Sequence, residues 1–294
     1  MLYMYVYHII TRFTCFNFRD AISSNRQYNM AKIMVETLDG IKMEYLHAGG
    51  ITLPLSFTPF LPEGEKYVKH VQGLKYLHIR DDDLYLATYP KCGTHWTWEI
   101  MTMLQKGDKE YSNKQKESVF VDFRPNSKLD QVPSPRILNS HYADRLIPRE
   151  IIEKKIKIVN VMRNPKDTFV SLYYHMKALL KEDIVRDFKT FLPYAMGTYG
   201  VCMYQPFYEY IKGWEAFTKE HPDQILNLFY EDMKEDPIRE IRKINEFLGT
   251  NRDDELIEQI AEACSFKNLK KADADVKVQE EGFVDLSFMY RKDL

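Results

Sequence analysis

One segment of the chain combines the residue types that bind anions. The apolar run Leu84–Thr88 leads into Tyr-Pro-Lys-Cys-Gly-Thr-His-Trp at positions 89–96, and an amphipathic stretch follows. This order predicts a strand, a tight loop and a helix N-terminus, where backbone N–H groups and the helix dipole attract an anion. Lys91 adds a positive charge, and Thr94 and His95 add hydrogen-bond donors. The segment is therefore predicted to bind phosphate.

The loop differs from the common nucleotide-binding motifs. In G-x-x-x-x-G-K-[ST] the lysine follows the second glycine, whereas here Lys91 comes two residues before Gly93. The chain also contains no G-x-G-x-x-G. These differences argue against nucleoside triphosphatases and Rossmann dehydrogenases.

Three further polar residues come just after predicted strands. His141, Arg163 and Tyr230 follow the short apolar runs at 136–139, 157–161 and 225–229. Ligands of open α/β sheets bind at the carboxyl ends of the strands, so we expect these side chains near the loop. A histidine there can act as a general base on a hydroxyl near neutral pH. Each residue taken alone also has a purely structural interpretation.

These residues need a scaffold that brings strand ends together. Predicted helices begin near Trp96 and at Pro165, with Asn164 as the N-cap of the second, and others cover about 203–219, 238–248 and 254–263. Strands that alternate with helices indicate the α/β class, with a central parallel sheet flanked by helices in a single three-layer domain. Residues 122–135, which contain three prolines, are predicted to be a surface connection.

Composition narrows the classes of function. The 294 residues carry a formal net charge of −2, which argues against a general nucleic-acid binder. The four cysteines are widely spaced without a C-x-x-C, so neither a disulfide framework nor a zinc site is indicated, and a reducing, cytoplasmic compartment is expected.

The residue pattern at the beginning of the chain differs from that of the rest. Residues 1–10 are apolar but too short to span a bilayer, and they lack the pattern of a secretory signal. Residues 1–30 are predicted to be a disordered or artefactual extension of a domain that covers 31–294. A weak membrane anchor is the alternative, and no stable membrane association is expected.

Taken together, these segments resemble the cytosolic sulfotransferase family over roughly residues 35–290. Y-P-K-C-G-T-H-W is similar to that family's Y-P-K-[SA]-G-T-[TN]-W loop, and V-M-R-N-P-K-D-T-F-V-S is similar to its R-N-x-K-D-x-x-V-S element. L-F-Y-E-D-M-K-E-D-P matches a third family segment, and Cys-Ser-Phe at 264–266 falls where the family has T-S-F. The resemblance implies an α/β fold with a P-loop-like, phosphosulfate-binding loop.

The resemblance also implies a cofactor and a mechanism. The family transfers a sulfuryl group from 3′-phosphoadenosine 5′-phosphosulfate (PAPS), leaves 3′-phosphoadenosine 5′-phosphate (PAP) and needs no metal. His141 would take the acceptor proton, and Lys91 would stabilise charge during in-line transfer. Arg163 and Ser171 would hold the 3′-phosphate. The residues that the resemblance implies as cofactor ligands are Lys91, Cys92, Gly93, Thr94, His95, Trp96, Arg163, Ser171, Tyr230, Ser265, Phe266, Arg291 and Lys292.

Four departures from the family pattern change these expectations. Cys92 replaces a serine and His95 a threonine or asparagine, with little expected loss. Asn-Ser-His at 139–141 stands where many members have K-T-H, so a lysine charge near the reacting group is expected to be missing and the reaction to be slower. The family's closing R-K-G-x-x-G-D-W-K-N loop is represented by Arg-Lys-Asp-Leu at 291–294. This predicts a truncated cofactor loop, weaker PAPS binding, and a monomer or weak dimer.

The expected acceptor is a small molecule with a hydroxyl or amine group. Aromatic residues favour an apolar or aromatic acceptor, and the candidates for its pocket are Phe57, Phe60, Phe123, Tyr142, Phe191 and Tyr194. Two alternatives remain open. One is a catalytically silent binding protein that keeps the fold without its cofactor lid, and the other is a small-molecule kinase with a divergent loop.

Overall fold

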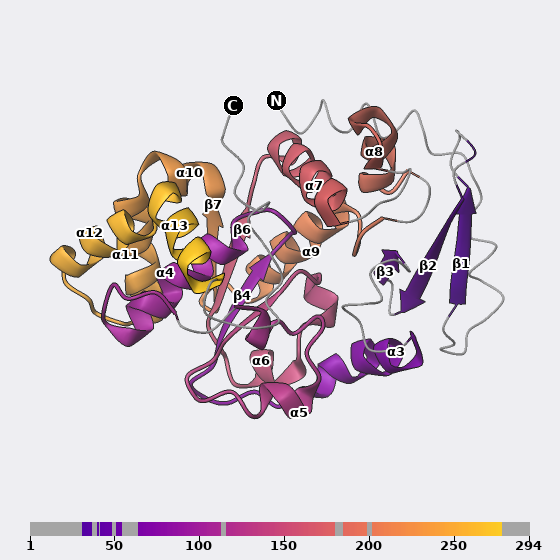
Figure 1. The fold of residues 1–294 in the computed structure, drawn as a ribbon. Coiled ribbons are helices and arrows are strands. Elements are labelled where there is room, and N and C mark those ends of the chain that lie inside the picture. The colour runs from indigo at the N-terminus through magenta and orange to yellow at the C-terminus, as the bar shows by residue number, and fades with distance from the viewer. Residues whose placement is uncertain are drawn as a thin grey trace.

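The core of the protein is a parallel β-sheet. The computed structural model describes residues 31–36, 40, 42–48, 51–54, 64–112, 116–179, 185–198 and 202–277. Four strands lie in the order β5-β4-β6-β7, and every neighbouring pair is parallel (Figure 1). Their bounds are Leu84–Thr88 for β4, Ile137–Ser140 for β5, Ile158–Met162 for β6 and Ile225–Phe229 for β7. Every residue of β4 and β5 is buried, as expected for parallel strands covered on both faces.

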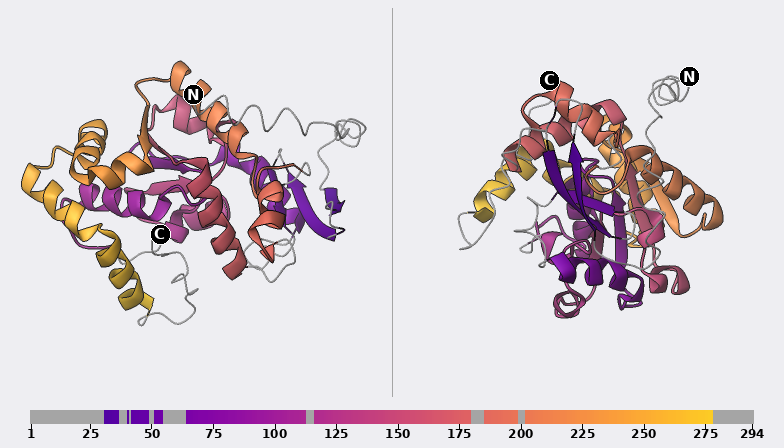
Figure 2. Two further views of the ribbon diagram at one scale, coloured as in Figure 1. Left: turned by 90° about the horizontal axis from the view of Figure 1, so that it is seen from above. Right: turned by 90° about the vertical axis from the view of Figure 1, so that its right-hand side faces the viewer.

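Helices cover both faces of this sheet (Figures 1 and 2). Helix α4 contacts β4 and β5, α11 and α12 contact α4, and α7 and α9 lie on the other side. The α-helices are α3 Gly64–Gly73, α4 Thr94–Lys106, α5 Asn126–Leu129, α6 Arg149–Glu153, α7 Pro165–Leu179, α8 Phe188–Ala195, α9 Phe207–Glu220, α10 Tyr230–Glu235, α11 Pro237–Leu248, α12 Asp254–Ala263 and α13 Phe266–Lys277. The 3-10 helices are η2 Leu74–Tyr76, η3 Lys116–Val119 and η4 Asp144–Leu146. The predicted α/β class with a central parallel sheet is confirmed.

Local sequence signals fix where several helices begin. The Asn164 side chain accepts a hydrogen bond from the Lys166 N–H at 3.0 Å, so the predicted N-cap of α7 is confirmed. Asp236 and Asp253 cap α11 and α12 in the same way. These caps set the direction in which each helix leaves the strand or loop before it.

A second, antiparallel sheet lies beside the main one and was not predicted. It has the order β1-β2-β3, with bounds Ala31–Glu36, Lys42–Ala48 and Ile51–Pro54. Thr52 of β3 exchanges two backbone hydrogen bonds with Tyr204, at 3.0 and 2.9 Å. The Thr52 hydroxyl also donates to the Cys202 carbonyl at 2.5 Å. The small sheet therefore holds the segment that contains Tyr204, which packs beside His141.

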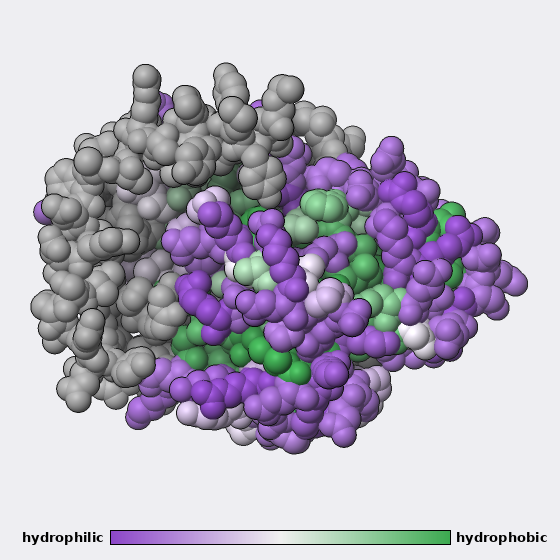
Figure 3. Space-filling model, turned by 180° about the vertical axis from the view of Figure 1, so that it is seen from behind, coloured by the Kyte–Doolittle hydropathy of each residue, from purple (hydrophilic) through white to green (hydrophobic). Residues whose placement is uncertain are grey.

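The surface of the described residues is mainly hydrophilic. Figure 3 shows the side of the molecule opposite to Figure 1, where purple residues predominate and apolar residues lie in recesses between them. Among the helices of the described ranges, none combines the length and the apolar character needed to cross a membrane.

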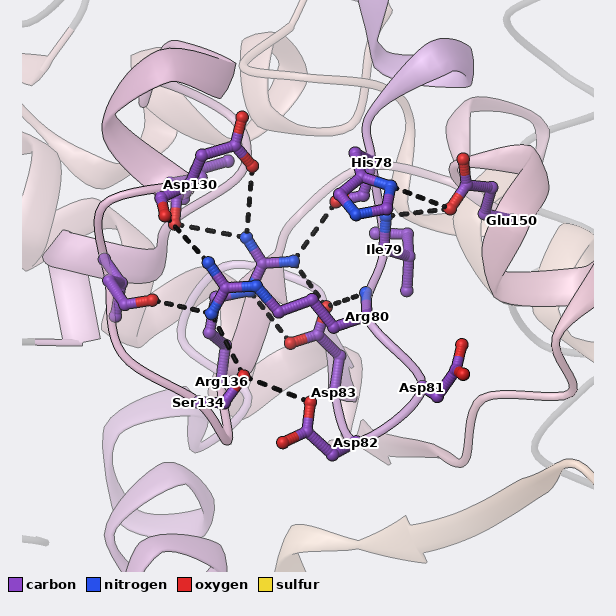
Figure 4. A network of polar contacts seen from close by, with 12 residues as sticks. His78, Ile79, Arg80, Asp81, Asp82, Asp83, Asp130, Ser134, Arg136 and Glu150 are labelled. Atoms are coloured by element: carbon purple, nitrogen blue, oxygen red, sulfur yellow. Dashed lines mark hydrogen bonds and ion pairs between the residues drawn. The ribbon is translucent and has the colours of Figure 1, made fainter.

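A buried ion pair joins the starts of β4 and β5. Asp83 precedes β4 and Arg136 precedes β5, and both side chains are fully buried. Arg136 Nε donates to Asp83 Oδ1 at 2.8 Å, and a second guanidinium nitrogen donates to Oδ2 (Figure 4). The Arg80 N–H donates to the same carboxylate at 2.7 Å, and the Leu84 N–H donates to the Arg136 carbonyl at 2.9 Å. The pair therefore fixes how the two strands begin, at the ends away from His141.

Removal of one member of this pair would leave a buried charge without its partner. We expect Arg136→Met to lower the free energy of unfolding by about 3–5 kcal/mol, measured by urea denaturation. The double variant Asp83→Leu/Arg136→Met removes both charges and should recover most of that loss. A single variant that unfolds within about 1 kcal/mol of the wild type would show that strand alignment does not depend on the pair.

Candidate functional site

Four chain segments meet at the carboxyl edge of the parallel sheet. The strand order β5-β4-β6-β7 places His141, the 89–93 loop, Arg163 and Tyr230 in sequence along this edge. Each segment directly follows its strand, as the sequence predicted. The loop after β4 therefore has His141 on one side, and Arg163 and Tyr230 on the other.

The loop after β4 has an unusual backbone. Lys91 has a φ of 70°, which is uncommon for a residue with a side chain, and Gly93 has a φ of 102° at the N-cap of α4. The Cys92 N–H donates to the Tyr89 carbonyl at 3.1 Å and closes the turn. A Cβ atom on Gly93 would lie 2.9 Å from the Tyr230 ring. The glycine therefore meets two demands at once, a left-handed backbone and a close aromatic neighbour.

Two loop side chains point into the protein. Cys92 is fully buried, with its sulfur 3.6 Å from the Thr168 hydroxyl, and burial raises the pKa of its thiol to about 12. The Thr94 and Thr88 hydroxyl oxygens lie 2.6 Å apart. Cys92 can therefore offer a ligand only its backbone, which agrees with the small expected effect of a cysteine at this position.

Arg163 and Tyr230 form the far half of the site. The Arg163 guanidinium lies over the Tyr230 ring at 4.1 Å and donates to the Lys91 carbonyl at 2.9 Å. The Trp96 ring meets the Tyr230 ring edge to face, with centroids 5.5 Å apart. Arg163 Nε and Trp96 Nε1 are buried donors that have no acceptor within the described part of the chain. Buried donors are normally paired, so these two favour a ligand with acceptor oxygens.

The loop lysine is held in an environment that disfavours its charge. Burial, which has the largest effect, and the positive charges of Lys116 and Arg163 together lower the pKa of Lys91 to about 8. Lys91 is therefore still largely charged at neutral pH, and an anion beside it would stabilise that charge.

The ring of His141 is fixed by a backbone carbonyl. Its Nδ1 lies 2.8 Å from the Thr88 carbonyl oxygen, which can only accept, so Nδ1 carries the proton. Nε2 is then the basic nitrogen of the neutral ring. Burial has the largest effect on His141 and, together with the charges of Lys116 and Lys91, it lowers the pKa to about 3, although the hydrogen bond to Thr88 acts in the opposite sense. The imidazole is therefore neutral, and able to accept a proton, throughout the neutral pH range.

Aromatic rings surround this histidine. Phe120 and Tyr204 meet the His141 ring edge to face, with centroids 5.0 and 5.5 Å apart. Phe123 and Tyr142, both predicted for the acceptor pocket, contact Tyr204 in turn. Phe120 and Tyr204 were not predicted, because neither lies in a recognisable motif and only the fold brings them to His141.

A buried carboxylate holds the end of β5. Asp122 is fully buried, and it accepts hydrogen bonds from the Ser140 hydroxyl at 2.5 Å and the His141 N–H at 2.9 Å. Burial raises the pKa of this carboxyl to about 7. The interpretation of 122–135 as a surface connection is therefore wrong at Asp122, and also at Leu129, which is fully buried on α5. An aspartate at the start of a stretch with three prolines is expected to be exposed, and only the contact with β5 explains why Asp122 is buried.

The other predicted ligands lie in several places. Ser171 is partly buried on the second turn of α7, His95 is partly buried in the first turn of α4, and Ser265 and Phe266 lie at the start of α13. Phe266 is 44% exposed. Phe191 and Tyr194 are buried on α8 and contact each other. Four predicted residues lie outside the described ranges: Phe57, Phe60, Arg291 and Lys292. Among the side chains that the structure describes, no cluster suited to a metal ion occurs.

The known proteins that this chain resembles are sulfotransferases. A family model described as the sulfotransferase domain matches residues 81–290. Sulfotransferase 1A1 of Canis lupus familiaris is 34% identical over 228 residues, which are 74% of this chain and 76% of the relative. Sulfotransferase 1E1 of Bos taurus is 34% identical over 223 residues, which are 71% of this chain and 73% of the relative.

Solved structures share the fold. Mouse sulfotransferase SULT7A1, crystallised as a complex with PAP, has a TM-score of 0.63 at 23% identity, covering 84% of this chain and 85% of its own. Retinol dehydratase, in complex with androsterone and inactive cofactor PAP, has a TM-score of 0.58 at 21% identity, covering 87% of this chain and 80% of its own. At these identities the similarity concerns the fold alone.

The close approach of Tyr230 to Gly93 can be tested by adding one methyl group. Gly93→Ala places a Cβ 2.9 Å from the ring at a φ of 102°, so we expect thermal unfolding at a lower temperature, by the equivalent of about 1–2 kcal/mol. Gly73→Ala is the matched control, because it has nothing within 4 Å and a φ of −77°. That variant should unfold at the same or a higher temperature. Equal effects at the two positions would contradict the described packing.

Proposed function

Because the chain belongs to the sulfotransferase family, we propose that it transfers a sulfuryl group from PAPS to a hydroxyl or amine of a small acceptor. PAPS, when bound, supplies the reacting group: a bond forms between the acceptor atom and sulfur, the bond from sulfur to the 5′-phosphate oxygen breaks, and PAP is the product. The protein's own residues then have three tasks, which are to bind the nucleotide, to balance negative charge and to take up a proton.

The observation that carries this proposal is the order of groups along the sheet edge. A neutral histidine lies next to an anion-binding loop with a lysine, and cationic and aromatic side chains continue on the other side of that loop. This order separates an acceptor half, around His141, from a nucleotide half, around Arg163. A transfer reaction needs such a pair of sites on either side of the reacting group.

The nucleotide half fits an anionic, aromatic ligand. Arg163 Nε and Trp96 Nε1 are buried donors that phosphate oxygens would satisfy, and the left-handed backbone at Gly93 turns the loop into the N-terminus of α4. The partly exposed Phe266 offers an apolar face for a base. We assign Ser171 and Ser265 to the same half because of the family resemblance. We assign Arg291 and Lys292, outside the described residues, to the 3′-phosphate on the same ground.

The acceptor half fits a hydroxyl on an apolar or aromatic molecule. His141 Nε2 would take the hydroxyl proton while Nδ1 keeps its hydrogen bond to the Thr88 carbonyl. Phe120, Phe123 and Tyr204 supply apolar walls on the same side. Lys91 and the loop N–H groups would stabilise charge on the oxygens around sulfur as the bond breaks.

Other features of the proposed function remain predictions. They are a cytoplasmic location, a monomeric or weakly dimeric state, and PAPS binding weakened by the divergent sequence at 291–294. The alternative is a catalytically silent protein that binds PAP but transfers no sulfate. An assay of sulfate transfer from PAPS distinguishes this alternative from an enzyme.

The role of His141 is tested by transfer of labelled sulfate from PAPS to a panel of phenols, alcohols and amines. We expect His141→Asn to lower kcat by about 100-fold or more, because its amide can still donate to Thr88 but cannot act as a base. PAP affinity, measured by calorimetry, should change little, and the control His221→Asn should keep full activity. A wild type that binds PAP but transfers no sulfate would favour the silent alternative. Full activity of the His141→Asn variant would show that His141 is not the general base.

The pKa of Lys91 predicts how nucleotide binding depends on pH. With a pKa of about 8, Lys91 loses its charge as the pH rises through that value, so the protonated, binding form becomes scarce above it. We expect the PAP dissociation constant to rise by up to about tenfold per pH unit above pH 8. Lys91→Arg stays charged over this range and should bind with an affinity that is independent of pH. Identical pH dependence in both proteins would show that another group controls binding.

A further inference from the structure

Lys116 is a cation near the site that lies in none of the sequence motifs. It begins η3, and its side chain is 11% exposed and ion-paired with Glu117. Its carbonyl oxygen accepts a hydrogen bond of 2.9 Å from the side-chain amide of Asn139, two residues before His141. A lysine from a separate element is therefore fixed to the end of the strand that carries the proposed base.

Phe120 connects Lys116 with the histidine. Lys116 Nζ lies 5.8 Å from the centre of the Phe120 ring, and that ring lies 5.0 Å from the His141 ring. Phe120 also forms a parallel β-bridge with Asn139. Two independent contacts, one through the backbone and one through a ring, thus hold η3 against the acceptor half of the site.

The charge of Lys116 reaches the groups proposed to act in transfer. Among the charged side chains, Lys116 lowers the pKa of His141 the most, ahead of Lys91. It also lowers the pKa of Lys91 more than Arg163 does, although Arg163 donates to the carbonyl of Lys91 itself. Glu117 acts in the opposite sense and raises the pKa of His141. The hydrogen bond that Asp122 accepts from His141 comes from the backbone N–H of that residue.

Asn139 links Lys116 to the family pattern. The family resemblance expects a lysine there, and its absence predicted a missing charge. In the structure Asn139 carries no charge but uses its amide to anchor the segment that supplies one. On the basis of the proposed function, we propose that Lys116 is the second cation of the transfer site and that Asn139 holds it in place.

Two neutralising substitutions test this charge without relying on loss of activity alone. Lys116→Met should lower kcat by about tenfold and move the acidic limb of the pH–rate profile upward, because less repulsion opposes protonation of His141. Glu117→Gln should move the same limb downward. A purely structural role would not shift the limb in opposite directions. The matched controls are Lys219→Met and Glu215→Gln, a surface pair whose N···O distance is 3.5 Å and which should leave the profile unchanged.

Further variants separate charge from shape. Lys116→Arg keeps the charge and should retain most of the activity, and Asn139→Ala should reproduce the loss seen in Lys116→Met. If Lys116→Met fails to fold, the downward shift in Glu117→Gln carries the test. Unchanged limbs in both neutralising variants, with an active wild type, would overturn the role of Lys116 and leave the proposed function intact.

PAP affinity supplies a readout that does not need turnover. We expect Lys116→Met to bind PAP at least about threefold more weakly than the wild type, because one positive charge near the 5′-phosphate is lost. If no protein transfers sulfate, the proposed function fails. The charge role of Lys116 is then upheld by weaker PAP binding in this variant and overturned by unchanged binding.

Discussion

The parallel pairing of β4 with both β5 and β6 is the constraint on which the site depends. Ala87 pairs with Ser140 and Thr88 with Val161, so three strands end at nearly the same level. Chain segments that are far apart in the sequence then meet, and the hydrogen bond from Arg163 to the Lys91 carbonyl spans 72 positions. The edge becomes a site because each strand is followed at once by a polar residue. At the opposite ends of β4 and β5, Asp83 and Arg136 fix the same alignment.

The same edge of the sheet concentrates interactions that destabilise the folded protein when no ligand is bound. Lys91, Arg163 and Lys116 carry like charges, and burial together with repulsion from the other two lowers the pKa of Lys91 to about 8. Asp122 is buried with its carboxyl pKa raised to about 7. Strain and repulsion of this kind are typical of functional sites, where a bound ligand supplies the missing partner. A highly charged anionic nucleotide would relieve the repulsion among the three cations.

Much of the fold could be predicted from local patterns, and the rest could not. The short apolar runs of β4, β6 and β7, and the Asn164-Pro165 start of α7, can be recognised from consecutive residues of the sequence. The attachment of the small sheet to Tyr204 and the burial of Asp122 depend on contacts between distant segments. For the same reason the sequence identified His141, Arg163 and Tyr230, which stand in motifs. It missed Phe120, Tyr204 and Lys116, which reach His141 only through the fold.

A crystal structure of the protein with PAP would show where the two phosphates bind relative to His141 and Arg163. We expect the 5′-phosphate to lie on the N–H groups of the 91–94 loop, next to Lys91, and the 3′-phosphate or base to occupy the side of Arg163, Trp96 and Tyr230. His141 Nε2 should face the 5′-phosphate from the other side of the loop. A nucleotide bound away from this edge, or one whose 5′-phosphate lies on the Arg163 side with no access to His141, would show that this edge of the sheet is not the transfer site.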